Sequence, residues 1–70
     1  MRNQTDRVEF YLDKSLNPMM IHDGSFQPEE GDLINILGTT YQVIGRSFTI
    51  DRAGSRDAVM RCNVILRVVE

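Results

Sequence analysis

A two-residue alternation over residues 58–69, AVMRCNVILRVV, with one wholly apolar face, constrains this chain more than any other feature. The odd positions of the run include Arg61, Asn63 and Arg67, whereas every even position is apolar: Ala58, Met60, Cys62, Val64, Leu66 and Val68. A period of two places successive side chains on opposite faces of a β-strand. The run therefore predicts a long strand whose even face meets a core.

Three earlier segments also have the pattern of strands. Residues 7–13 alternate, with Val8, Phe10 and Leu12 on one side, which is typical of a half-buried strand. Residues 19–21 are apolar and predict a short second strand within a long connection. Residues 33–37 are almost wholly apolar, which predicts a strand covered on both faces.

A longer strand follows the apolar run, and its pattern contains a break. Gly38-Thr39 predicts a tight hairpin, because glycine adopts the positive φ that such turns need. Tyr41 and Val43 are odd-numbered, whereas the next apolar residues, Phe48 and Ile50, are even-numbered. One extra residue near Gly45 restores the register, so we predict a β-bulge or sharp bend there.

These segments predict an all-β fold. We expect four or five antiparallel strands in a small, partly open barrel or strongly bent sheet. The chain of 70 residues is long enough for one domain only, which we place at residues 7–70 after a loose tail at residues 1–6. Phe26, just before a proline, is expected to fold back beneath the barrel. Because no segment has a sustained helical period, we expect no helix.

Residues 26–45, FQPEEGDLINILGTTYQVIG, resemble a pattern found in many small bacterial and phage proteins of unknown function. In that pattern a proline and a glycine–aspartate step lead into a strand, followed by a glycine turn and then tyrosine–x–valine. The resemblance implies a Src-homology-3-like barrel and a bacterial or phage origin. Its residues are structural, so it implies no activity.

The sequence offers no set of catalytic side chains, and we predict that the protein is not an enzyme. His22 is the only histidine, so no serine has a positioned base and a third orienting group. No cysteine and histidine spacing suits a metal, and we expect neither metal nor cofactor. A chain this short is also expected to lack the walls for a pocket of a few hundred Å³ or a small-molecule substrate. Cys62 is expected to be buried and unreactive.

Charge is unevenly distributed along the chain. Residues 1–44 carry three basic and seven acidic residues, a sum of −4, whereas residues 45–70 carry five arginines and three acidic residues, a sum of +2. Arginine suits carboxylate and phosphate partners. We therefore predict a partner-binding surface on the C-terminal hairpin, formed by Tyr11, Arg46, Arg52, Arg56, Arg61 and Arg67.

These residues give two functional hypotheses. The first is a protein-interaction module: an adaptor, inhibitor or assembly subunit, of phage or mobile-element type, that binds another protein or self-associates. The alternative is single-stranded nucleic-acid binding through the same basic face. A purely structural interpretation also exists, in which the arginine face is only solvated, or Glu9 and Tyr11 pair with Arg61 or Arg67 across the strands.

A location is suggested by cysteine content and hydropathy. The single Cys62 forms no internal disulfide, which favours a reducing compartment. No apolar run approaches the roughly 20 residues needed to cross a bilayer, and no leader pattern opens the chain. We therefore expect a cytoplasmic protein without membrane contact. A homo-oligomer is an alternative to a monomer that the sequence leaves open, since association is a common remedy for a small core.

Overall fold

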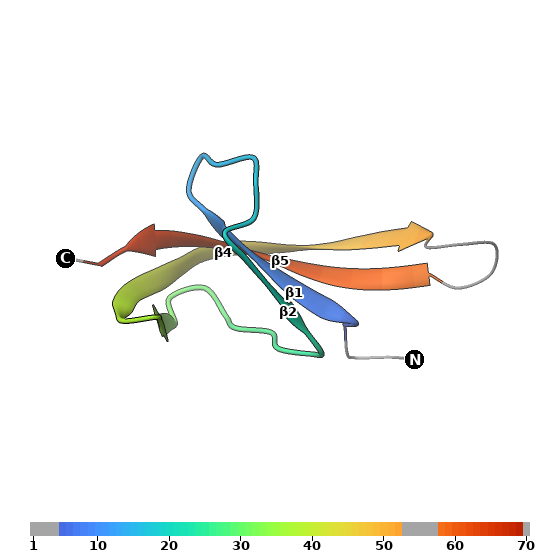
Figure 1. Ribbon diagram of the computed structural model, residues 1–70, viewed down its shortest axis with the longest axis horizontal. Helices are drawn as coiled ribbons and strands as arrows, with labels where there is room; N and C mark the ends of the chain where they lie inside the picture. Colours follow the sequence, from blue (N-terminus) through green and yellow to red (C-terminus); the bar gives the residue numbers. More distant parts are fainter. Residues whose placement is uncertain (1–4, 53–57, 70) are drawn as a thin grey trace.

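The computed structural model describes residues 5–52 and 58–69, which form one five-stranded sheet curled into a half-barrel (Figure 1). The strand order is β2-β1-β5-β4-β3, and no helix occurs in the described ranges. The predicted all-β fold is confirmed. The strands are β1 (Arg7–Leu12), β2 (Met20–Asp23), β3 (Leu33–Ile36), β4 (Thr39–Arg52) and β5 (Ala58–Val68).

One pairing differs from the antiparallel arrangement that we predicted. Strands β1 and β5 are parallel, with partners running from Arg7↔Arg61 to Leu12↔Leu66, so the sheet is mixed. The other three pairings are antiparallel. Direction is fixed locally only where a short turn joins two strands. Because β1 reaches β5 through all the intervening strands, either direction was open to it.

Strands β4 and β5 form a long hairpin that carries the rest of the sheet. It pairs from Tyr41↔Val68 to Arg52↔Ala58, with a register shift between Val43 and Gly45. The predicted β-bulge is thereby confirmed at the predicted position. In Figure 1 the far end of this hairpin projects beyond the ends of β1 and β2.

A small core lies on the concave side of the sheet. The central even residues of β5 are buried as predicted, whereas Ala58 and Val68 at its ends are exposed. Three half-buried side chains, Ile34, Ile36 and Tyr41, pack against this core. The buried apolar residues are Val8, Phe10, Val43, Cys62, Val64 and Leu66.

Strand β3 differs from the expectation that both its faces are covered. Leu33 is 64% exposed because it lies on the convex face, which no other described element covers, and Leu37 in the turn after β3 is 95% exposed. The turn to β4 has positive φ at two successive residues, Leu37 (51°) and Gly38 (92°), as in the type I′ turns of tight hairpins. The prediction of a hairpin turn at Gly38 is confirmed.

Contacts of the sheet begin before β1. The amide of Asp6 donates to the carbonyl of Met60 (2.8 Å), and the amide of Met60 donates to the Asp6 carboxylate (2.7 Å). Thr5 is also buried, so Thr5 and Asp6, which the sequence placed in the tail, both contact the sheet. Of the predicted loose tail, residues 1–4 lie outside the described residues, as does the predicted loop at residues 53–57.

Within the described ranges there is no helix of the length and apolarity needed to cross a membrane.

Candidate binding site

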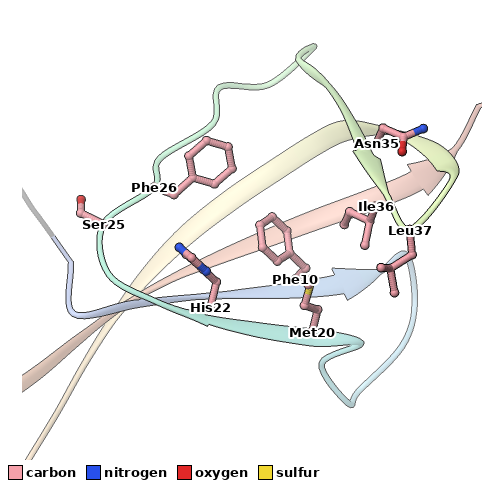
Figure 2. A pocket seen from close by; sticks show the side chains of 8 residues that line it. All are labelled: Phe10, Met20, His22, Ser25, Phe26, Asn35, Ile36 and Leu37. Atoms are coloured by element: carbon pink, nitrogen blue, oxygen red, sulfur yellow. The ribbon is translucent and has the colours of Figure 1, made fainter.

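A cavity of about 450 Å³ opens on the concave side of the half-barrel, between the two edge strands β2 and β3. We call it the mouth. It corrects the expectation that so short a chain cannot wall a pocket: the curl of the sheet, together with the loop that carries Ser25 and Phe26, walls this open hollow. The mouth is lined by Phe10, Met20, His22, Ser25, Phe26, Asn35, Ile36 and Leu37 (Figure 2).

Two aromatic rings form the centre of the mouth. Phe10 rises from β1 and is buried, and Phe26 approaches it from the loop after β2 (Figure 2). The ring centroids are 6.3 Å apart with a tilt of 50°, a favourable geometry for aromatic pairs. The sequence predicted that Phe26 folds back under the barrel. It does reach Phe10, but nearly half of its surface stays exposed.

The two lips of the mouth are formed by the edge strands. Met20 and His22 alternate along β2 and line one lip, and Ile36 and Leu37 line the other (Figure 2). Both strands pair with a neighbour on one side only. Each lip therefore presents exposed backbone donors and acceptors next to an apolar cavity, as in sites that accept an extended segment.

Leu37 is held at the lip by its neighbours. The side-chain oxygen of Asn35 accepts from the amide of Gly38 (3.2 Å), and its nitrogen donates to the hydroxyl of Thr40 (3.2 Å). These bonds fix the turn in which Leu37 has positive φ. A bulky residue in this conformation is unusual, so the fold holds an apolar side chain in solvent at a conformational cost.

On the convex face, Glu9 is almost fully buried among charged and polar side chains. Arg7 and Arg61 form ion pairs with its Oε2 (3.2 and 3.3 Å), and the Tyr11 hydroxyl donates to its Oε1 (2.8 Å). Arg61 also pairs with Asp51. We call these five residues the Glu9 cluster. The sequence-based pairing of Glu9 with Arg61 is confirmed.

The cluster changes the proton affinity of its members. Burial raises the pKa of Glu9, but hydrogen bonds from Tyr11 and Arg61, with the charges of Arg61 and Arg7, outweigh burial and hold the pKa below its ordinary value. The hydrogen bond to Glu9 raises the pKa of Tyr11. Arginine and carboxylate charges balance here, so the cluster is neutral as a unit.

The other predicted binding arginines are distributed over both faces. Arg46 lies on the concave side, where it donates to the carbonyls of Gln27 (3.3 Å) and Pro28 (3.1 Å) and lies 5.6 Å from the Phe48 ring centroid. Arg67 binds the Gln42 side chain on the convex side, with bonds of 3.1 and 2.6 Å. The described guanidinium groups thus have partners within the chain.

The two remaining arginines of the predicted partner surface are Arg52 and Arg56. Arg52 ends β4, but its side chain lies outside the described residues, and so does all of Arg56.

Cys62 lies in the centre of the core, as predicted. Its side chain is fully buried, and burial raises the pKa of its thiol. Because the thiolate is the reactive form, such a thiol is inert. No group of three or more histidine, cysteine, aspartate or glutamate side chains in the described ranges is placed to hold a metal ion.

A second exposed apolar surface lies at the far end of the hairpin. Phe48 is 54% exposed and Ile50 is 64% exposed, although parity in the sequence placed both toward the core. They do lie on the concave side, opposite Cys62 and Met60, but no other strand of the described chain covers them. We call residues 48–52 and 58–60 the arm.

Comparison with protein-family models, with curated proteins and with solved structures gave no match. The resemblance of residues 26–45 to Src-homology-3-like proteins therefore stays a prediction.

Proposed function

We propose that this protein is a non-enzymatic protein-interaction module, serving as an adaptor, inhibitor or assembly subunit, that binds through the mouth and the C-terminal hairpin. The observation that carries the proposal is the amount of apolar surface left in water. Contiguous exposed apolar patches on a small protein mark binding surfaces. The mouth and the arm are two such patches on one concave side.

The balance of buried and exposed residues supports the proposal. Among the described residues, twelve large apolar side chains are exposed, whereas six apolar residues form the core. A core of that size gives marginal stability to a domain this short. Binding of a partner over the mouth or the arm would bury further apolar surface and so stabilise the fold.

The arginines that we predicted as contacts have a supporting role in this proposal. Arg46 fixes the loop beside the mouth, and Arg61 joins β5 to β1 through Glu9. Their internal partners hold the two apolar surfaces in place. Nucleic-acid binding has no comparable support, since phosphate contacts would have to compete with these bonds.

The remaining features of the proposal come from the sequence. A cytoplasmic location agrees with the single, buried Cys62, and a bacterial or phage origin follows from the resemblance of residues 26–45. The proposed partners are proteins or further copies of this chain, with no cofactor.

Capture of partners from a native bacterial lysate tests the proposal. The tagged wild type is compared with Phe48→Thr/Ile50→Thr, which keeps strand-forming residues but removes the apolar surface of the arm. Leu16→Asn is the matched control, because Leu16 is 94% exposed and lines neither surface. We expect the wild type and the control to retain the same partner and the arm variant to lose it. Equal capture by all three proteins contradicts the proposal.

A further inference from the structure

We propose that the mouth binds the arm of a second copy of this chain, so that the protein self-associates head to tail. The inference rests on the proposed function and specifies its partner. It joins the two exposed apolar surfaces of the chain, neither of which has a cover within the described residues. The contact is heterologous, because one copy contributes its arm and the other its mouth.

The shape of the arm fits an edge-strand site. Strand β4 pairs with β3 only over Thr39–Gln42, so residues 47–52 have no strand neighbour on that side within the described chain. Phe48 and Ile50 alternate along this free edge and point to the concave side. A strand of this kind adds to an exposed sheet edge by backbone hydrogen bonds while alternate side chains enter a pocket.

Charge also favours this pairing. Residues 13–38, the segment that contains both lips of the mouth and the loop between them, carry Lys14 against five exposed carboxylates, a sum of −4. The carboxylates surround the mouth without lining it, and they are those of Asp13, Asp23, Glu29, Glu30 and Asp32. The described hairpin residues 45–52 and 58–69 carry four arginines against Asp51, a sum of +3. Within the arm itself Asp51 and Arg52 balance, so the opposite charge belongs to the two segments as wholes. It steers the hairpin of one copy toward the mouth of another and disfavours contact between two mouths.

The arm cannot reach the mouth of its own chain. It continues the β4–β5 ladder without a break beyond Gly45 and projects away from β1 and β2 (Figure 1). Arg46 ties the loop at Gln27 and Pro28 between the two surfaces. Each copy therefore offers a free arm and a free mouth, and association continues until a ring closes or a filament grows.

A mixing experiment with two defective variants tests the head-to-tail contact. The arm variant is Phe48→Thr/Ile50→Thr. The mouth variant is Met20→Thr/Leu37→Asn, in which asparagine suits the positive φ of residue 37. Leu16→Asn is again the control. Mass is measured by sedimentation equilibrium up to about 1 mM protein, the weak end of specific affinity, and amide NMR spectra verify that each variant is folded.

We expect the wild type and the control to exceed the 8.0 kDa of one chain increasingly with concentration, and each variant alone to stay at one chain. An equimolar mixture should form a heterodimer of twice that mass and nothing larger, since its remaining arm and mouth are both defective. A mixture that stays monomeric overturns the proposal. That result would indicate a two-fold symmetric contact that needs both the arm and the mouth to be intact on each copy. A wild type that stays monomeric also overturns it; arm-dependent capture of a different protein would then leave the proposed function standing.

Discussion

The Glu9 cluster and the mouth lie on opposite faces of the same sheet and reverse the usual relation between polarity and exposure. The cluster is charged, yet Glu9 is only 4% exposed and its charges are balanced internally. The mouth is apolar, yet Met20, Phe26 and Leu37 are exposed. At these two places the charged carboxylate is covered within the fold, and the apolar side chains are exposed to solvent. Residue type alone does not tell which surface of a very small domain binds a partner.

The largest effect on stability is expected where the charged cluster is broken. Glu9→Ala leaves Arg7 and Arg61 without their shared carboxylate, and we expect a loss of about 2 kcal/mol in the free energy of unfolding, below the range for fully buried pairs because both arginines are partly exposed. Urea unfolding gives the value. Glu30→Ala, which removes an exposed carboxylate of the loop between β2 and β3, should change stability by less than about 0.5 kcal/mol. Equal effects of the two substitutions would contradict the contrast between the faces.

Acid should weaken the same cluster. The pKa of Glu9 is lower in the folded chain than in the unfolded one, so its contribution to stability is complete above the unfolded pKa. It is lost as the pH falls through the folded pKa. We expect thermal unfolding between pH 7 and pH 2 to show this loss in the wild type. Glu9→Gln should flatten the dependence, and an unchanged pH profile in that variant would exclude Glu9 as its source.

Substitution at the lip should have the opposite sign. Leu37→Gly removes an exposed side chain that adopts positive φ, a conformation that costs a non-glycine residue about 1 kcal/mol. We expect a gain in the free energy of unfolding of up to that amount, together with weaker binding at the mouth. Ile36→Gly, in the adjacent half-buried position, should instead destabilise the fold. Destabilisation by Leu37→Gly would show that the lip belongs to the core.

The smallest effect on stability is expected at the end of the hairpin. Arg52→Glu/Arg56→Glu reverses two charges of the predicted partner surface, and the free energy of unfolding should change by less than about 0.5 kcal/mol. Partner capture, by contrast, should be abolished, because the reversal replaces two positive charges of the predicted partner surface with negative ones. Arg52→Lys/Arg56→Lys keeps the charge and serves as the control. Unchanged capture after charge reversal would limit the binding surface to its apolar residues.

Local patterns in the sequence predicted much of this fold. Alternation identified Cys62, Val64 and Leu66 as core residues, and the change of parity placed the β-bulge at Gly45. Both signals are local, because parity within one strand decides which side chains share a face. Parity does not decide whether that face is covered. Phe48 and Ile50 have the parity of the core but lie past the strands that would bury them.

Features of the fold that depend on distant parts of the chain left no local pattern in the sequence. The parallel pairing of β1 with β5 depends on how the ends of the chain meet, and the mouth depends on the curl of the whole sheet. The burial of Glu9 was only partly predictable: alternation places Arg7 and Tyr11 on the same face as Glu9, and cross-strand pairing pointed to Arg61, but neither pattern indicates that these side chains close over the carboxylate. The mouth was missed because its lining residues lie on three separate segments.

The position of β5 has a consequence for how this protein is made. The strand nearest the C-terminus is the middle strand of the sheet, flanked by β1 and β4, and Asp6 meets Met60 across 54 residues of sequence. Contacts of such separation form slowly, since a long loop must close first. During synthesis, β1–β2 and β3–β4 emerge as two separate hairpins, each marginal in water by itself. Only β5 joins them into one sheet, so a stop codon between β4 and β5 leaves two separate hairpins instead of a shortened domain.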